Sequence, residues 1–349
     1  MEKVSDRDSA LEYLSRRTRS LERRTRIRPM TSLEIVDSAF QFYRSMGWSL
    51  VRHLLVPCIL IYGVLRFVSY YLVPALTTTS FPDDPAAQAI ELFLVFLTAI
   101  GIGVPLMMLA LSAISGIVTS ASSDYLCGNK LDDRAAARAG TEAIGPMVWP
   151  LATAFFWSLL PLLLSFGLML GSAVLEGEGR GVDLSTGLAA ILGVMGVASS
   201  FLIGPMILCR FALVPSVVVI EGLKGRKAVR RAVKLLNEKV PFFSPFGVLI
   251  SGVLLLAVMG LIVGFGFDAA WGFIGVENWV QSFFGTGWAS SLLVTLLNAV
   301  PFVLAAVFVA PVWCALTTFL YFNQRARLEG YDIEMLAEDA ARANPRLLA

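Results

Sequence analysis

The chain contains 349 residues, of which 56% are hydrophobic and only 15% are charged, and its mean hydropathy is +0.73. Soluble globular proteins carry about 25% charged residues, and several apolar runs here exceed the roughly 20 residues that a helix needs to cross a bilayer. The composition therefore excludes an ordinary soluble enzyme, an intrinsically disordered chain and a small disulfide-stapled domain. Because the net charge is only +2, the placement of the charges says more than their sum.

The apolar runs are continuous rather than alternating, which predicts an all-α polytopic membrane protein and excludes a transmembrane barrel. Six transmembrane helices are predicted, over residues 54–76, 90–120, 148–175, 187–210, 246–267 and 288–322, the fourth with an apolar extension to Ile220. The first run begins well beyond the length of a signal peptide, so we expect it to act as an uncleaved membrane anchor.

Lysine and arginine are concentrated on one set of connecting segments. Of the 28 basic residues, 25 lie in the region through His53, in the 121–147 and 221–245 loops, or after Phe322. The loops expected on the opposite side hold only Arg180. By the positive-inside rule, both termini are predicted to be cytoplasmic, in a bacterial cytoplasmic (inner) membrane.

Amphipathic segments precede three of the spans. Residues 31–50 and 223–239 show the apolar periodicity of a helix, and residues 129–143 are a weaker, alanine-rich version. We expect these segments to lie as interfacial helices on the cytoplasmic surface, and a short aromatic-rich helix within 269–287 to lie at the outer interface. The plan of helix, span and span occurs three times, which indicates either a three-fold internal repeat or chance, because residue identity between the units is negligible.

Glycines within the spans offer sites for close helix packing. Gly167 with Gly171, and Gly260 with Gly264, have the GxxxG spacing that suits such contacts. Accidental matches are expected among 29 glycines in an apolar chain, so the spacing alone does not establish a dimer.

Two arginines lie inside or at the end of predicted spans, where charges are costly and often functional. Arg66 is a candidate contact for an anion or substrate; its alternatives are snorkelling to headgroups or a salt bridge to Glu91 or Asp268. Arg210 lies in a proline-broken stretch, as found at transporter substrate sites, or simply at headgroup depth on a bent helix end. Both are therefore candidate binding residues.

The chain offers little material for catalysis. It has one histidine, His53, and its four cysteines are scattered in or beside apolar runs, which fits small buried side chains better than a disulfide or metal framework. The sequence contains no phosphate-binding loop, nucleophile elbow, zinc-protease motif or pair of intramembrane carboxylates. We therefore predict no catalytic residue, no metal ligand and no cofactor.

The residues before the first amphipathic segment are rich in arginine. Seven arginines lie between positions 16 and 28, and each contributes about 1 kcal/mol of attraction when it lies close to an anionic leaflet. We expect this arm to bind anionic headgroups of membrane lipids. Binding of nucleic acid is not favoured, because no aromatic residues are interleaved with the arginines.

Three stretches carry motif-like sequence: RPMTSLEIVDSAFQFYR at 28–44, VPSVVVIEG at 214–222 and LYFNQRARLEGYDIE at 320–334. Together they resemble a bacterial membrane family, the membrane domain attached to some glycerophosphoryl diester phosphodiesterases. Leu33 and Asn323 depart from the family pattern, which usually has glycine and aspartate at these positions. The resemblance implies a polytopic helical fold. It implies no phosphodiesterase activity, because no catalytic domain of that kind is attached here.

Charged residues of the first and last of these stretches are expected to meet on the cytoplasmic face. We predict a salt-bridge belt that closes the bundle, in which Asp37 and Arg325 form the pair to test. Its members are Glu34, Asp37, Arg44, Arg325, Arg327, Glu329 and Asp332.

The sequence predicts three parts: a basic cytoplasmic arm (1–28), a six-span membrane domain (29–322) and a cytoplasmic tail (323–349). It favours a non-enzymatic scaffold or accessory subunit that organises lipid or a partner complex at the cytoplasmic membrane, with a protein partner or homo-oligomer among the expected interactions. The alternative is a small-solute or lipid transporter with Arg66, Arg210 and the proline-broken spans along its path.

Overall fold

The computed structural model describes residues 28–45, 48–67, 101, 103–129, 131–177, 191, 195–196, 198–199, 203–238, 244–285 and 287–334. Within these residues every regular element is a helix. Five helices are long and apolar enough to cross a membrane, or up to six if the bent pair of α2 and α3 is one span. The predicted all-α polytopic membrane fold is thereby confirmed.

The first amphipathic segment forms α2 (Ser32–Ser45), which is followed by α3 (Trp48–Phe67). One face of α2 is buried through Ile35, Ala39 and Phe42, a spacing that places these side chains on one side of a helix. The helices of this pair meet at 103°. The bend separates the amphipathic helix from the first span, and α3 begins before the predicted start at residue 54. The predicted end of this span lies outside the described residues.

The next pair is α6 (Val104–Leu126) and α7 (Asp133–Gly177). The helix predicted over 129–143 is not separate from the span predicted over 148–175, because both belong to the 45-residue α7. The Asp132 side chain accepts hydrogen bonds from the N–H groups of Arg134 and Ala135 and so caps the start of α7. At about 1.5 Å per residue, α7 is roughly 68 Å long, far more than one bilayer crossing requires.

The fourth predicted span is broken near its end. A helical stretch over 203–211 is followed by a turn at Ala212 and Leu213 and then by α9 (Val214–Glu221). Pro215 lies in the first turn of α9, where its missing N–H leaves no partner unsatisfied. Gly222 ends α9 with φ of 67°, a conformation that favours glycine.

The second strongly amphipathic segment forms α10 (Gly225–Asn237), which confirms the helix predicted over 223–239. Its buried face consists of small and apolar side chains: Ala228, Ala232, Leu235 and Leu236. The predicted repeat plan is thus visible before α3 and again before α11, where an amphipathic helix precedes a span. In the middle unit the amphipathic segment runs directly into α7.

The last pair of long helices is α11 (Pro245–Ile274) and α13 (Trp288–Glu329), with the short α12 (Val276–Phe284) between them. The presence of α12 confirms the short aromatic-rich helix predicted within 269–287. The sixth span was predicted to end at Phe322, but α13 continues without interruption to Glu329. Its C-terminal turns therefore project beyond the apolar part of the helix.

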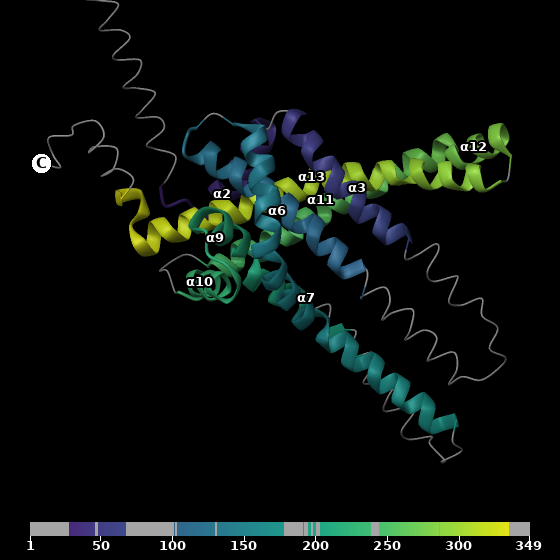
Figure 1. Cartoon of the computed structure of the whole chain (residues 1–349), viewed down its shortest axis with the longest axis horizontal. Helices are drawn as coiled ribbons and strands as arrows, with labels where there is room; N and C mark the ends of the chain where they lie inside the picture. The colour runs from purple at the N-terminus through teal and green to yellow at the C-terminus, as the bar shows by residue number, and fades with distance from the viewer. Residues whose placement is uncertain are drawn as a thin grey trace, which may run out of the picture.

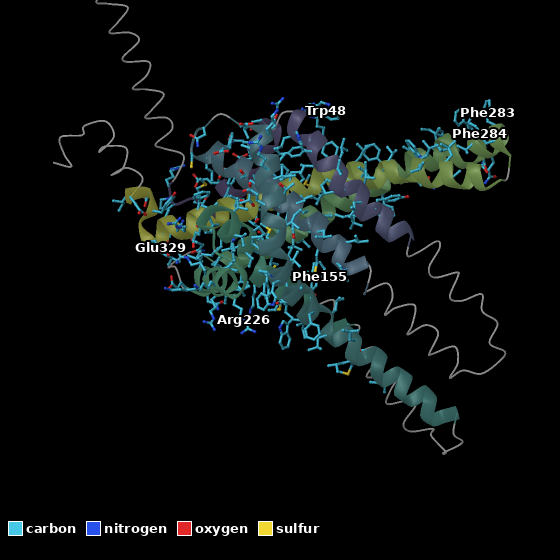
Figure 2. All side chains as sticks on the ribbon, viewed as in Figure 1. Trp48, Phe155, Arg226, Phe283, Phe284 and Glu329 are labelled. Atoms are coloured by element: carbon cyan, nitrogen blue, oxygen red, sulfur yellow. The ribbon has the colours of Figure 1, made fainter. Side chains whose placement is uncertain are left out.

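Figure 1 shows α11 and α13 running side by side, with α12 at their tip, while α7 projects in another direction. At the opposite end α2, α9, α10 and the C-terminal end of α13 gather around the C-terminal half of α6; we call this region the hub. Figure 2 shows Arg226 and Glu329 at the hub and Phe283 and Phe284 at the far tip. The chain thus has a polar end and an apolar end.

The core of the hub contains hydroxyl groups shared by three helices. Thr318 of α13 lies 3.4 Å from the hydroxyl of Thr119 on α6 and 3.5 Å from that of Ser216 on α9. All three side chains are fully buried. Such contacts join helices inside an apolar interior where unpaired hydroxyl groups are costly.

A close helix approach occurs at a glycine pair whose spacing along the chain carries no signal. A Cβ atom placed on Gly116 of α6 would lie 2.8 Å from the Cα atom of Gly140 on α7. By contrast, Gly167 and Gly264 of the GxxxG pairs have nothing within 4 Å, and Gly260 approaches only Val309. The surroundings of Gly171 lie outside the described residues. These three glycines therefore make no close helix contact within the described part of the chain.

Candidate functional site

An ion-pair cluster joins α9, α10 and α13 at the hub. Arg231 of α10 lies between Glu221, 3.1 Å away at the end of α9, and Glu329, at the end of α13. The guanidinium of Arg231 binds both carboxylates at once. Its Nε–H donates to Glu221, and its Nη2–H donates to Glu329 at 2.7 Å. Tyr321 donates its hydroxyl hydrogen to Glu221 at 2.8 Å, and Arg325 pairs with Glu329 at 3.1 Å. We call Glu221, Arg231, Tyr321, Arg325 and Glu329 the polar cluster.

The charges of the polar cluster balance, with two guanidinium groups and two carboxylates. Hydrogen bonds to Glu329 raise the pKa of Arg231 above its usual range, against the opposing effect of desolvation, and the Glu221 charge raises it further. The guanidinium of Arg325 also lies 4.0 Å from the centre of the Tyr331 ring, which adds a cation–π contact. Since every charged group here is engaged by another, the polar cluster holds the C-terminal ends of α9 and α13 against the middle of α10.

The N-terminal segment and the end of α13 are joined through one buried amide. Asn323 is only 1% exposed, and its Oδ1 accepts the backbone N–H of Met30 at 2.6 Å. Arg327 donates to the same Oδ1 at 3.3 Å and to the Met30 carbonyl at 2.8 Å. Residues 293 positions apart in the sequence are thus connected.

The belt expected from the sequence divides into separate groups. Glu34 pairs with Arg28 at 2.8 Å, while Asp37 accepts a hydrogen bond from Gln41 of its own helix. Arg325 and Glu329 belong to the polar cluster, and Arg327 binds the Met30 backbone. No ion pair between Asp37 and Arg325 is found in the described part of the chain. The partners that the sequence analysis missed are Glu221 and Arg231.

Of the remaining candidates, Arg44 lies exposed in the last turn of α2 and Asp332 lies half-buried beyond α13. Arg210 is exposed on the helical stretch over 203–211. Arg66 occupies the penultimate position of α3, but its side chain lies outside the described residues. The structure brings none of the three described side chains, those of Arg44, Arg210 and Asp332, into the polar cluster.

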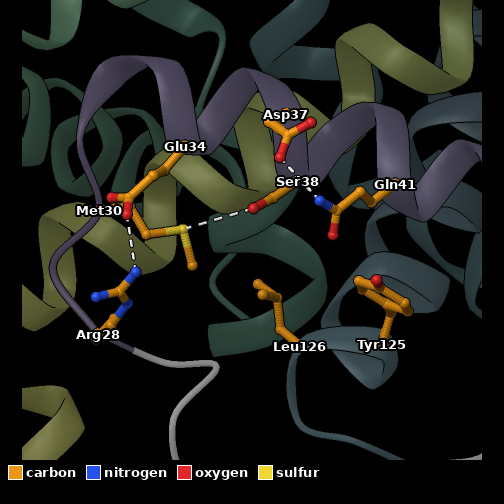
Figure 3. A pocket seen from close by; sticks show the side chains of 8 residues that line it. All are labelled: Arg28, Met30, Glu34, Asp37, Ser38, Gln41, Tyr125 and Leu126. Atoms are coloured by element: carbon orange, nitrogen blue, oxygen red, sulfur yellow. Dashed lines mark hydrogen bonds and ion pairs between the residues drawn. The ribbon is translucent and has the colours of Figure 1, made fainter.

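A cleft of about 350 Å³ lies between α2 and the C-terminal end of α6. Figure 3 shows that one face of α2 forms its upper wall, Tyr125 and Leu126 lie below, and the segment at Arg28 and Met30 lies at one end. We call this the α2–α6 cleft. Its lining residues are Arg28, Met30, Glu34, Asp37, Ser38, Gln41, Tyr125 and Leu126.

The start of α2 is held by a capping box that the sequence analysis overlooked. The Thr31 hydroxyl accepts the N–H of Glu34 at 3.3 Å, and the Glu34 carboxylate accepts the N–H of Thr31 at 2.8 Å. The signal was the Thr-x-x-Glu spacing at 31–34. The capping box fixes Glu34 at the rim of the cleft.

No group of three or more histidine, cysteine or carboxylate side chains that could hold a metal ion occurs among the described residues. No protein-family model, no curated protein and no solved structure matches the chain. The features of the chain that bear on function are therefore the polar cluster and the α2–α6 cleft of the hub.

Proposed function

We propose that the chain is a non-enzymatic scaffold or accessory subunit of a bacterial cytoplasmic membrane, which organises lipid or a partner complex through the hub on the cytoplasmic face. The observation that carries the proposal is the polar cluster, because Arg231 binds Glu221 and Glu329 at once. Its charges are paired with one another, which supports a role in shaping the hub. The resemblance to the phosphodiesterase-associated membrane domain stays an expectation about the fold.

The outer face of α10 supports contact with anionic headgroups. The helix buries its small and apolar residues and exposes its basic ones: Arg226, Lys227, Arg230 and Lys234. Arg226 also lies 5.5 Å from the centre of the Trp149 ring on α7. Basic residues near an anionic leaflet contribute about 1 kcal/mol each, and the concentration of basic residues on this side of the chain supports a cytoplasmic position for the hub.

The test is purification of the full chain in native lipid particles, followed by mass spectrometry of the proteins and lipids that remain bound. Reversing two exposed charges of α10, in Lys227→Glu with Arg230→Glu, should reduce the retained anionic lipid or partner protein. The matched control is Gln281→Glu, on the exposed surface of α12 at the far tip. Equal retention by all three proteins contradicts the proposal. So does solute flux into proteoliposomes that depends on the protein.

A further inference from the structure

The α2–α6 cleft carries an uneven distribution of charge. Four side chains of α2 line it, at positions 34, 37, 38 and 41, a spacing that places them on one helix face. The charge of Glu34 is offset by Arg28, whereas among the described residues the Asp37 carboxylate is held by the Gln41 amide alone, at 2.8 Å. The cleft therefore combines a guanidinium at one end with an excess of one negative charge further along the helix.

The floor of the cleft is held in place by aromatic packing. The Tyr125 ring lies 5.5 Å from the Phe42 ring in an edge-on arrangement and 6.4 Å from the Phe319 ring in a stacked one. Phe42 and Phe319 are both fully buried. A ring fixed in this way offers a rigid wall, and aromatic rings attract cations.

The cleft lies where a span ends. The apolar candidate span of α6 runs from Val104 to Leu126, and Leu126 itself lines the cleft. Two apolar side chains near the junction of α2 and α3 are exposed, Leu33 on α2 and Trp48 at the start of α3, at 82% and 75%. Tryptophan at the end of a span is typical of headgroup depth, which favours a position of the cleft at that depth.

We propose that the α2–α6 cleft binds the headgroup of an aminophospholipid of the phosphatidylethanolamine class. Asp37 and the Gln41 carbonyl accept N–H groups of the primary ammonium beside the Tyr125 ring, and Arg28 faces the phosphate. This inference rests on the proposed lipid-organising role and adds to it a site and a lipid class. The volume of about 350 Å³ falls at the small end of the range of about 300–1,000 Å³ for ligand sites.

The chemistry of the wall favours a primary ammonium over the trimethylammonium of choline. Carboxylate and amide oxygens gain hydrogen bonds only from a cation that carries N–H groups, and a site built for such donors rejects an analogue without them. A purely anionic headgroup would bring its charge next to Asp37 without neutralising it. One net hydrogen bond, of about 1.4 kcal/mol, corresponds to about a tenfold preference.

The experiment is native mass spectrometry of the full chain released from nanodiscs that contain equal amounts of phosphatidylethanolamine and phosphatidylcholine. The wild-type chain should retain the ethanolamine lipid with about a tenfold preference. Asp37→Leu, which removes the acceptor oxygens, should lower this preference towards unity, and Asp37→Lys should abolish it because the new ammonium occupies the cleft. Glu142→Gln, a neutralisation on the exposed surface of α7, should leave it unchanged.

An equal ratio of the two lipids on the wild-type chain, or an unchanged preference in Asp37→Leu, overturns the inference. Loss of the retained lipid on adding soluble phosphoethanolamine at low concentration overturns the lipid assignment in favour of a free phosphorylated amine. The experiment on α10 measures retained anionic lipid and partner proteins instead. If the α10 charge reversal lowers that retention while the wild-type chain holds the two lipids in equal ratio, the cleft proposal fails and the proposed function stands.

Discussion

The Oδ1 atom of Asn323 lies 2.6 Å from the backbone nitrogen of Met30, and this hydrogen bond fastens the segment before α2 to the end of α13. The Nδ2 atom of the same amide is buried without a hydrogen-bond partner among the described residues. Only one of the two polar atoms of Asn323 is therefore used. The bond keeps the segment with Arg28 and Met30 beside the α2–α6 cleft.

Two replacements of Asn323 distinguish the contribution of its acceptor oxygen from the contribution of its side-chain shape. Asn323→Leu removes the acceptor and leaves the Met30 N–H buried, which should cost about 1–3 kcal/mol of unfolding free energy. Asn323→Asp keeps the acceptor, loses no hydrogen bond at Nδ2 and gains charge attraction from Arg327. Unfolding in mixed micelles, followed by intrinsic fluorescence, measures the unfolding free energy of both variants. Equal stability of the two variants would show that the Met30 bond is unimportant.

The polar cluster predicts a specific pattern of coupling. Arg231→Ala leaves Glu221 and Glu329 without their shared partner and should lower the unfolding free energy by about 2 kcal/mol. A double-mutant cycle between Arg231 and Glu329 should give a coupling energy in the range of about 0.5–3 kcal/mol. The same cycle between Asp37 and Arg325 should give none, because each pairs within its own helix. Rescue by the Asp37–Arg325 double charge reversal would contradict this structure.

Much of the fold follows from patterns that the sequence displays directly. Apolar runs longer than a bilayer crossing indicate the spans, and the 3.6-residue periodicity of 223–239 indicates α10, because both patterns reflect local chemistry. The partners of charged residues depend on which helix ends meet. Nothing near Arg231 in the sequence shows that Glu329, 98 positions away, lies beside it.

Glycine contacts and helix ends follow less directly from the sequence. GxxxG spacing permits close approach but does not specify a neighbour, and a close contact is found where Gly116 faces a glycine on another helix. The span predicted to start at residue 148 was placed where charge falls and hydropathy rises. Helix formation depends instead on backbone hydrogen bonds and propensity, so α7 begins at the Asp132 cap and continues through its alanine-rich first part into the span.

The capping box at the start of α2 predicts a dependence on pH. The hydrogen bond from the Thr31 N–H and the nearby Arg28 charge hold the pKa of Glu34 below its usual value. Because the folded-state pKa is lowered, this stabilisation is present above the ordinary glutamate pKa and is lost as the pH falls through the lowered one. The hydrogen-exchange protection factors of the first turn of α2 should therefore fall under acidic conditions.

Two variants check the origin of this effect. Thr31→Ala removes the side-chain half of the capping box and should destabilise the start of α2 by about 1 kcal/mol. Glu34→Gln keeps an acceptor oxygen but cannot titrate, so the pH dependence of the protection factors should disappear while neutral-pH protection is largely kept. If the protection factors in Glu34→Gln still fall on acidification, another group is responsible.

The contact of α6 and α7 at Gly116 predicts that these helices tolerate no added volume there. A Cβ atom on Gly116 would lie 2.8 Å from the Gly140 backbone and 2.9 Å from the Ala143 side chain. Because the nearest atom belongs to the backbone, an alanine here fits only if α6 or α7 shifts. Gly116→Ala should cost about 1–3 kcal/mol of unfolding free energy through overpacking, more than its gain of about 1 kcal/mol in helix propensity. Gly145→Ala is the matched control on α7, because nothing lies within 4 Å of its added Cβ atom, and it should be neutral or slightly stabilising. Unfolding in mixed micelles compares the two, and equal stability would mean that α6 and α7 do not approach closely at Gly116.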